Sequence, residues 1–352
     1  MQNKYIFHII SSLANGGAEN VLARVVEEFK KKDLEQIVIT LNGSTNDFHY
    51  KKVISFCEVV DFKTDPNRIY DLFQLHANAT VLAWMYKAIY YSHIWKIKNS
   101  TSQTIFWNIR HSNFGPKQIY QKGMLNLFGL ASLILKPMVI YCSYKSKEVH
   151  EKAFFSKKRS SVIVNRLAKV IVKTKTIKNK KQVPFLLFVG RFDPQKGPKH
   201  LRDIVSKFFN QEDTIELWIA GNGWDINYFP EEIRSRVKLL GNIKDIYYLY
   251  INAKGLLFTS IFGEGYPNVL VEAASVGLPI VGFEAGDSRL ILEDFRFGYP
   301  VNTHSEFLDK LNYILYNPIT EEQKKEETLR QQKLLDFNIT VQEYLYFLTK
   351  AS

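Results

Sequence analysis

Short apolar runs of the kind that form buried strands recur along the whole chain and alternate with stretches of helical pattern. One series begins at Lys4–Ile10, and a second begins in mid-chain at Pro184–Val189, which is a continuous apolar run. Alternation of this kind favours parallel sheets that are covered by helices. Because 352 residues are many for one core and natural for two domains, the pattern predicts an α/β chain with two domains.

Each half of the chain has its own set of expected strands. In the first half they are Lys4–Ile10, Gln36–Leu41, Thr80–Trp84, Thr104–Asn108 and Val139–Ser143. In the second half they are Pro184–Val189, Thr214–Ala220, Val237–Leu240, Gly255–Thr259 and Pro279–Phe283. The segment between Asn165 and Gln182 is dense in Lys and Thr, and we interpret it as the connection between the domains.

Charge is distributed unevenly between the two halves. Residues 1–182 contain 29 Lys and Arg against 12 Asp and Glu, a net charge of +17, whereas residues 183–352 contain 18 against 23, a net charge of −5. This asymmetry suggests an anionic partner for the first half, either nucleic acid or the anionic leaflet of a membrane. The only two cysteines, Cys57 and Cys142, have no metal-type spacing and indicate a reducing cytoplasm without disulfides.

The most membrane-like window of the sequence is Gly123–Tyr141. Lys136 and Pro137 interrupt its apolar run. We therefore interpret this window as a helix followed by a strand rather than as a membrane span.

A pair of glutamates, Glu264 and Glu272, is separated by seven residues, and a Gly-x-Pro turn follows the first of them. Pro267 suits the first turn of a helix, and Gly277 marks its end. The amides of a helix N-terminus suit an anion, while a carboxylate accepts the two hydrogen bonds of a sugar diol. This combination suits a nucleotide-sugar. The alternative is an ordinary amphipathic helix with solvated glutamates.

A second candidate ligand-binding motif, G-R-F-D-P-Q-K-G, occupies Gly190–Gly197 and follows an expected strand. Gly190 allows the backbone to approach a ligand closely. Arg191 and Lys196 place two cations at the carboxyl edge of a parallel sheet, where open α/β folds bind ligands, and their charges suit a diphosphate. The alternative is a surface turn with solvated charges.

Both strings resemble the motifs of glycosyltransferase family 4, the E-x7-E motif and the G-R-x4-K-G segment. The resemblance covers roughly residues 5–300 and is stronger in the second half. It implies a GT-B architecture, in which two Rossmann-like domains face each other across a cleft, and a retaining transfer of sugar. The expected division is an acceptor-binding domain over 1–168, a linker over 169–183, a nucleotide-sugar-binding domain over 184–335, and a helix over 336–352 that crosses back to the first domain.

The resemblance also assigns roles to individual residues. The donor-binding residues that it implies are Gly16, Gly17, Gly190, Arg191, Lys196, Ile243, Glu264, Gly265, Tyr266, Pro267, Asn268, Val269 and Glu272. The catalytic residues that it implies are Glu264, His111, Arg191 and Lys196. Gly16 and Gly17 open a G-G-A-E segment, and His111 stands where the family often has a histidine that touches the donor sugar.

The acceptor site is the least specific of these expectations. The stretch W-M-Y-K-A resembles a W-M-Y-x-A stretch of one bacterial subgroup, with Lys87 where that subgroup usually has histidine. The expected acceptor residues are Trp84, Tyr86, Lys87 and Arg110. The run Trp84–Lys98 is either a partly buried helix or an interfacial, acceptor-binding helix.

Taken with the resemblance, these residues predict a glycosyltransferase of bacterial surface polysaccharide synthesis (O-antigen, capsule or exopolysaccharide). The expected donor is a UDP-sugar, and the expected acceptor is a glycan or polyprenyl-linked glycan. No cofactor and no metal are expected, because the nucleotide-sugar is a substrate and the basic residues can neutralise its diphosphate. We expect a cytoplasmic protein on the inner face of the membrane.

Two alternatives stay open from the sequence. One is a nucleotide-sugar epimerase of the same fold, which the two motifs fit less well. The other is a basic nucleic-acid-binding protein, which the charge of the first half suggests, although no recognisable binding module is present. We therefore expect no nucleic-acid partner. No sequence pattern identifies the sugar, the base or the acceptor.

Overall fold

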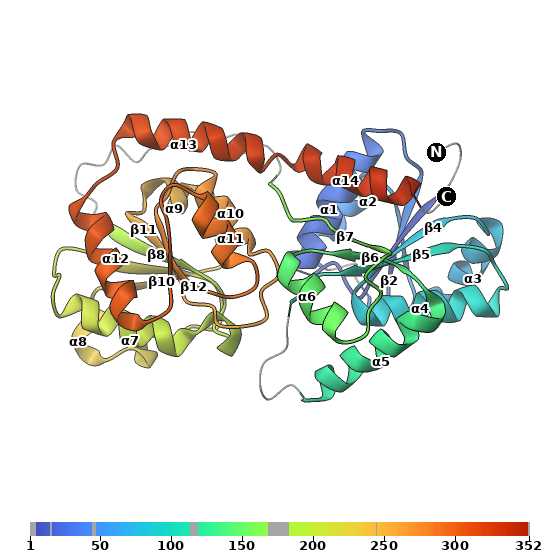
Figure 1. Cartoon of the computed structure of the whole chain (residues 1–352), viewed down its shortest axis with the longest axis horizontal. Coiled ribbons are helices and arrows are strands. Elements are labelled where there is room, and N and C mark those ends of the chain that lie inside the picture. Colours follow the sequence, from blue (N-terminus) through green and yellow to red (C-terminus); the bar gives the residue numbers. More distant parts are fainter. Residues whose placement is uncertain are drawn as a thin grey trace. The chain divides into compact units, whose positions relative to one another are not determined.

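The computed structural model describes residues 5–14, 16–43, 47–112, 119–167, 183–243 and 245–350, with the backbone alone for 119–121. The chain divides into two compact units (Figure 1). The N-terminal unit comprises Met1–Ala168 and Phe337–Ser352, and the C-terminal unit comprises Lys169–Asp336. Residues 169–182 of the expected linker lie outside the described residues.

The N-terminal unit is built on a seven-stranded parallel sheet of order β3-β2-β1-β4-β5-β6-β7. Its strands are β1 Ile6–Ile10, β2 Gln36–Thr40, β3 Glu58–Asp61, β4 Thr80–Trp84, β5 Thr104–Ile109, β6 Met138–Tyr141 and β7 Ser160–Val162. Its helices are α1 Gly17–Lys30, α2 Tyr50–Ile54, α3 Pro66–Leu75, α4 Met85–Lys98, α5 Ile119–Leu135, α6 Tyr144–Lys152 and α14 Phe337–Thr349. The window Gly123–Tyr141 thus forms a helix and then a strand, as predicted.

Both faces of this sheet are buried. Along β1, Phe7 and Ile9 belong to one hydrophobic cluster, whereas Ile6 and Ile10 belong to another. This alternation follows from the two-residue period of a strand. Because side chains on both faces must be apolar, the strands read as continuous apolar runs, which is why the sequence reveals them.

The last helix, α14, belongs to the N-terminal unit and lies beside α1 (Figure 1). The hydroxyl of Tyr344 accepts hydrogen bonds from Asn108 Nδ2 at 3.0 Å and from Arg110 Nη1 at 3.3 Å. Thr340 Oγ1 donates to the carbonyl of Val164 at 2.9 Å. The end of the chain is therefore fastened to strand ends of this unit.

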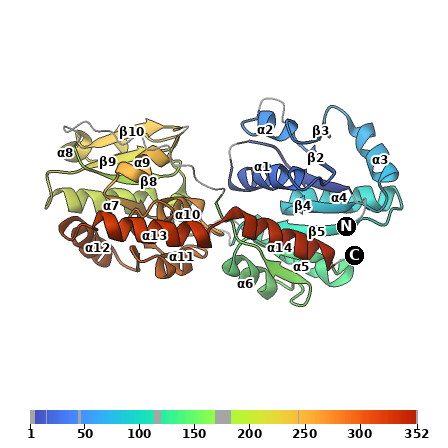
Figure 2. The ribbon, with the colours of Figure 1, turned by 90° about the horizontal axis from the view of Figure 1, so that it is seen from above.

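The C-terminal unit repeats the design with a six-stranded parallel sheet of order β10-β9-β8-β11-β12-β13. Its strands are β8 Phe185–Val189, β9 Glu216–Ala220, β10 Val237–Gly241, β11 Gly255–Phe258, β12 Ile280–Phe283 and β13 Gly298–Val301. Its helices are η1 Pro194–Lys196, α7 Pro198–Phe209, η2 Ile226–Tyr228, α8 Glu231–Arg234, α9 Tyr247–Asn252, α10 Asn268–Ala274, α11 Ser288–Asp294, α12 His304–Tyr316 and α13 Glu321–Leu334. In Figure 2 the elements of this unit run from yellow-green at β8 to red at α13, and the red helix α14 belongs to the N-terminal unit.

The expected α/β fold with two parallel sheets is confirmed. Three strands were not predicted, and all of them, β3, β7 and β13, lie at sheet edges. An edge strand buries less surface, so its apolar pattern is weaker, as in the half-exposed β3. In β13 the sequence includes Pro300, which an edge strand tolerates because it needs only one set of ladder hydrogen bonds.

Candidate functional site

Two loops meet at the carboxyl edge of the C-terminal sheet. One follows β8, the other follows β11, and these strands are neighbours. Thr259 Oγ1 donates to the carbonyl of Lys196 at 2.9 Å, and the amide of Ile261 donates to the carbonyl of Gln195 at 3.1 Å. The G-R-x4-K-G loop and the loop that precedes the E-x7-E helix are therefore fastened together, at the edge where open α/β sheets bind ligands.

The centre of this site is an ion pair between two residues 68 positions apart in the chain. Lys196 Nζ lies 2.6 Å from Glu264 Oε1, and Ser260 Oγ donates to the same oxygen at 2.8 Å. Glu264 is only 8% exposed. A carboxylate at this depth needs a charged partner, so the pair fixes the position of the Lys196 ammonium group. The sequence predicted both charged residues, and Ser260, the second residue after β11, was missed.

Two glycines, one on the loop after β8 and one on the loop after β12, allow the backbone to pack closely around this pair. Gly197 has a φ of +64°, and a Cβ atom there would lie 1.9 Å from the carbonyl oxygen of Thr259. Gly286 has a φ of +63°, and its Cβ would lie 2.3 Å from the carbonyl oxygen of Glu264. At both positions a side chain would displace the backbone that carries Lys196 or Glu264.

Arg191 lies on the same loop and is open to solvent. Its side chain is 66% exposed, and its Nε atom pairs with Asp193 Oδ2 at 3.1 Å. The other carboxylate oxygen of Asp193 accepts the amide of Gln195 at 2.9 Å and so caps η1. Since only Nε is engaged, the rest of the guanidinium fork remains available to a bidentate anion. Asp193, which orients this cation, was not predicted.

The second glutamate lies inside α10. This helix begins at Asn268, with Pro267 as its N-cap rather than in its first turn, and Glu272 is its fifth residue. Glu272 Oε2 accepts a hydrogen bond from Tyr250 OH at 3.0 Å. Burial, together with the negative charge of Glu272, raises the pKa of Tyr250 well above its ordinary value, so the phenol stays protonated and donates. No signal in the sequence pointed to Tyr250.

The remaining donor-binding candidates of this unit surround these groups. Gly190, Gly265, Tyr266, Asn268 and Val269 are half-buried and Pro267 is buried. Ile243, which follows β10, is 37% exposed. The amide of Gly221 donates to the carbonyl of Gly241 at 2.8 Å, which joins the turn after β9 to the last residue of β10.

In the N-terminal unit, the predicted glycines stand at the start of a helix. Gly16 is the N-cap of α1 and Gly17 is its first residue, directly after the turn that follows β1. The preceding residue, Asn15, lies outside the described residues. The burial of Glu19 in the first turn raises the pKa of its carboxyl group.

His111 follows β5 and packs among other rings. Its ring centroid lies 5.5 Å from that of Tyr86 and 5.4 Å from that of His150. Burial, and to a smaller extent His150, lowers the pKa of His111 to about 3. The ring is therefore neutral at pH 7, which excludes an ionic contact with a phosphate, and both of its nitrogens are buried.

The expected acceptor residues need a correction. Trp84 is fully buried, and Tyr86 is 4% exposed and shares a 2.7 Å hydrogen bond with Nε2 of His150. Both side chains therefore pack inside the N-terminal unit and present no surface to an acceptor. Lys87 is exposed and donates to Asn42 Oδ1. Arg110 lies over the Trp84 ring at 5.6 Å with its Nε and Nη2 atoms buried, so Lys87 is the exposed acceptor candidate among the four.

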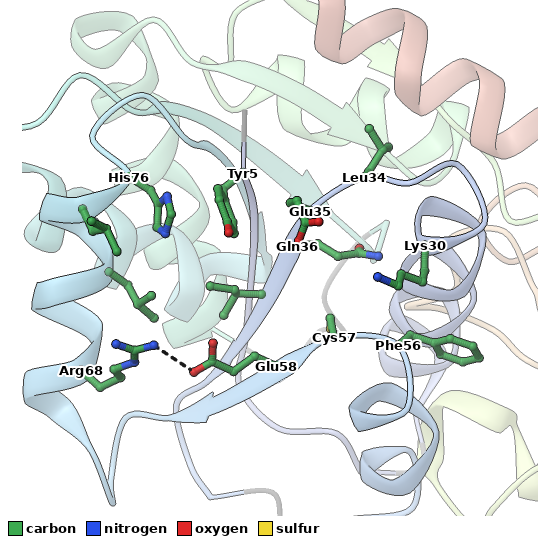
Figure 3. A pocket seen from close by; sticks show the side chains of 13 residues that line it. Tyr5, Lys30, Leu34, Glu35, Gln36, Phe56, Cys57, Glu58, Arg68 and His76 are labelled. Atoms are coloured by element: carbon green, nitrogen blue, oxygen red, sulfur yellow. Dashed lines mark hydrogen bonds and ion pairs between the residues drawn. The ribbon is translucent and has the colours of Figure 1, made fainter. Parts of the chain in front are cut away.

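The N-terminal unit also contains a cavity of about 410 Å³ (Figure 3). It opens where β1, β2 and β3 begin, among Tyr5, Gln36 and Glu58, with Arg68 pairing with Glu58 at 3.5 Å. This is the amino edge of the sheet, opposite to the edge at which parallel α/β sheets bind substrates. We therefore do not assign the cavity to the functional site.

Within the described ranges, no group of three or more His, Cys, Asp and Glu side chains is arranged to hold a metal ion. Over the same residues, no helix combines the length and the apolar character that crossing a bilayer requires.

Comparison with known proteins supplies independent information on the C-terminal unit. Residues 183–317 match the family model described as "Glycosyl transferases group 1". Among curated proteins, the phosphatidyl-myo-inositol mannosyltransferase of Mycobacterium leprae is 28% identical over 149 residues, which are 39% of this chain and 38% of that protein. The match thus spans well under half of the relative's length.

Solved structures match over the whole chain. HepE of Anabaena in complex with UDP superimposes with a TM-score of 0.80 at 18% identity, covering 99% of this chain and 100% of that chain. The same protein has been solved with UDP-glucose. The apo form of the lipopolysaccharide outer core galactosyltransferase WaaB gives a TM-score of 0.73 at 19% identity, with coverages of 99% and 100%. At these identities the likeness shows the fold, with both parallel sheets.

Proposed function

We propose that this chain, which has the GT-B fold and whose residues 183–317 match the group 1 glycosyl transferases, transfers a sugar from a nucleotide-sugar to a hydroxyl group. The observation that carries the proposal is the Lys196–Glu264 pair at the carboxyl edge of the C-terminal sheet, with Arg191 exposed on the same loop. Two cations suit a diphosphate, and a fixed carboxylate suits the hydroxyls of the attached sugar.

In the proposed reaction, the bond between the anomeric carbon and the donor phosphate oxygen breaks, and a bond from the acceptor oxygen to that carbon forms. The proton of the acceptor hydroxyl passes to an oxygen of the departing diphosphate. Arg191 and Lys196 stabilise the charge that develops on the diphosphate, and because they are held in place beforehand, little reorganisation is needed. The configuration at the anomeric carbon is retained, and no protein nucleophile is required.

The other proposed roles are those that the family resemblance implies. Glu264 faces the sugar, Glu272 accepts hydrogen bonds from the ribose, and neutral His111 contacts the sugar. UDP is the proposed nucleotide, which the UDP and UDP-glucose complexes of HepE support. The proposed acceptor is a glycan or a polyprenyl-linked glycan of bacterial surface polysaccharide, held at the inner membrane face.

The proposal predicts transfer that needs no metal ion. The protein is first screened for thermal stabilisation by UDP-, GDP- and ADP-sugars, and the stabilising donor is then supplied in labelled form with polyprenyl-linked and soluble glycan acceptors. We expect label in the acceptor, and most of this activity should persist in saturating EDTA because Arg191 and Lys196 supply the positive field.

Three results would contradict parts of this account. Complete inhibition by EDTA that Mg²⁺ reverses would remove metal independence. Isomerised donor without transfer to any acceptor would identify an epimerase. If the protein bound none of the nucleotide-sugars but bound random DNA in a salt-dependent way, a nucleic-acid-binding protein would be favoured.

A further inference from the structure

One face of α5 exposes an apolar stripe. Leu127, Leu130 and Ile134 follow the three- and four-residue spacing of a helix face and are 66%, 51% and 83% exposed. The opposite face, with Leu125 and Ser132, is buried against the unit. Contiguous exposed apolar side chains of this kind are uncommon on soluble monomers and mark interaction surfaces.

The stripe continues onto the loop after α6. A Cβ atom on Gly129 would lie 1.6 Å from the carbonyl oxygen of Ala153, so this glycine allows the loop to touch the helix. Ser132 Oγ donates to the carbonyl of Phe154 at 3.3 Å, and the Phe154 side chain is 55% exposed. Figure 1 shows α5 and α6 as neighbours along the edge of the N-terminal unit. We define the α5 surface as Leu127, Leu130, Leu133, Ile134, Leu135 and Phe154.

Basic side chains border the α5 surface. Lys136 follows α5 directly, and Arg159 Nη1 donates to its carbonyl at 2.7 Å, while Lys157 and Lys158 are exposed on the same loop. Residues 119–160 contain eight Lys and Arg against two Glu. Those glutamates, at 148 and 151, already pair with lysines of α6. The border is therefore cationic.

We propose that the α5 surface docks the protein on an anionic lipid bilayer, with its apolar side chains at the acyl boundary and the bordering cations among the headgroups. Apolar side chains with flanking Lys and Arg are what an interfacial helix requires. A second copy of this surface would bring two cationic borders together, which disfavours self-association. The inference rests on the proposed function in one respect, since it supposes that the acceptor is carried by a membrane.

Co-sedimentation of the full chain with vesicles tests this surface. The vesicles are phosphatidylcholine alone or mixed with phosphatidylglycerol, at low and at high salt. We expect binding to the anionic vesicles that high salt weakens. The paired substitution Leu130→Gln with Ile134→Gln, and separately Lys157→Gln with Lys158→Gln, should each lower the partition coefficient roughly tenfold or more.

Matched controls lie on other parts of the same unit. Leu75→Gln changes a residue that is 72% exposed at the end of α3, and Lys63→Gln changes an exposed lysine. Both should bind vesicles like the parent. The surface assignment would be overturned if the α5 variants bound vesicles like the parent, or if binding did not depend on the charge of the lipid. It would also be overturned if these substitutions converted a dimer to monomers without changing vesicle binding.

The two proposals fail in separable ways. Thermal stabilisation by the donor should be unchanged in the α5 variants, and vesicle binding should be unchanged in Arg191→Ala. If the parent protein binds no donor but still binds vesicles, only the transferase proposal is overturned.

Discussion

Replacement of Glu264 by alanine is expected to lower the turnover number of sugar transfer by about 10²–10³-fold, the range typical of losing one preorganised polar group at a reacting centre. Affinity for UDP should change little or rise slightly, because the Lys196 ammonium, now 2.6 Å from Glu264 Oε1, would be released toward the diphosphate. Steady-state kinetics together with calorimetric titration of UDP measures both quantities.

Ser260→Ala is the matched control, since it removes a 2.8 Å hydrogen bond to the same carboxylate oxygen and leaves the charge in place. Its effect on turnover should be much smaller. If Glu264→Ala weakened the binding of UDP and of the UDP-sugar equally, the assignment of Glu264 to the sugar would be contradicted.

The second large effect is expected from Gly197→Ala. Gly197 and Gly241 have nearly the same φ, +64° and +63°. A Cβ atom at Gly197 would lie 1.9 Å from the Thr259 carbonyl oxygen, whereas a Cβ atom at Gly241 would meet nothing within 4 Å. Gly241→Ala should cost about 1–2 kcal/mol of unfolding free energy through left-handed strain alone. Gly197→Ala should cost about 3 kcal/mol or more, because the loop must also move.

Thermal and denaturant unfolding of the two variants measures this difference. Since the Gly197 loop carries Lys196, donor affinity should also fall in Gly197→Ala and stay near the parent value in Gly241→Ala. Equal stability of the two variants would mean that the contact between the loops after β8 and β11 is not as described.

The fold class could be predicted because buried parallel strands are apolar on both faces. β1, with five buried residues, and β8 illustrate this. The same physics explains the strands that were missed, since β3, β7 and β13 are edges with weaker patterns. Pro300 in β13 even argues locally against a strand, and only the position at the sheet edge makes it acceptable.

Arg191 and Lys196 were predicted from their places after a strand end, and Glu264 and Glu272 from their seven-residue spacing at the start of a helix; the roles of all four stay predictions. What the sequence could not show is how they pair. The contact of Lys196 with Glu264 joins loops far apart in the chain, and the hydrogen bond from Tyr250 to Glu272 follows from packing of α9 against α10. Trp84 was assigned to an acceptor from its neighbours in the sequence, although an aromatic residue at the end of a central strand packs equally well inside.

The central claim is that a donor diphosphate binds at Arg191 and Lys196, and calorimetric titration of UDP into the parent and Arg191→Ala tests it most directly. Arg296→Ala is the control, because Arg296 is an exposed arginine that precedes β13 at the amino edge of the same sheet. We predict that the parent and Arg296→Ala bind UDP alike, and that Arg191→Ala loses about 1.5–3 kcal/mol, as expected for charge-assisted hydrogen bonds. Equal binding of UDP by all three proteins, or binding of no nucleotide among UDP, GDP and ADP by the parent, would contradict the account.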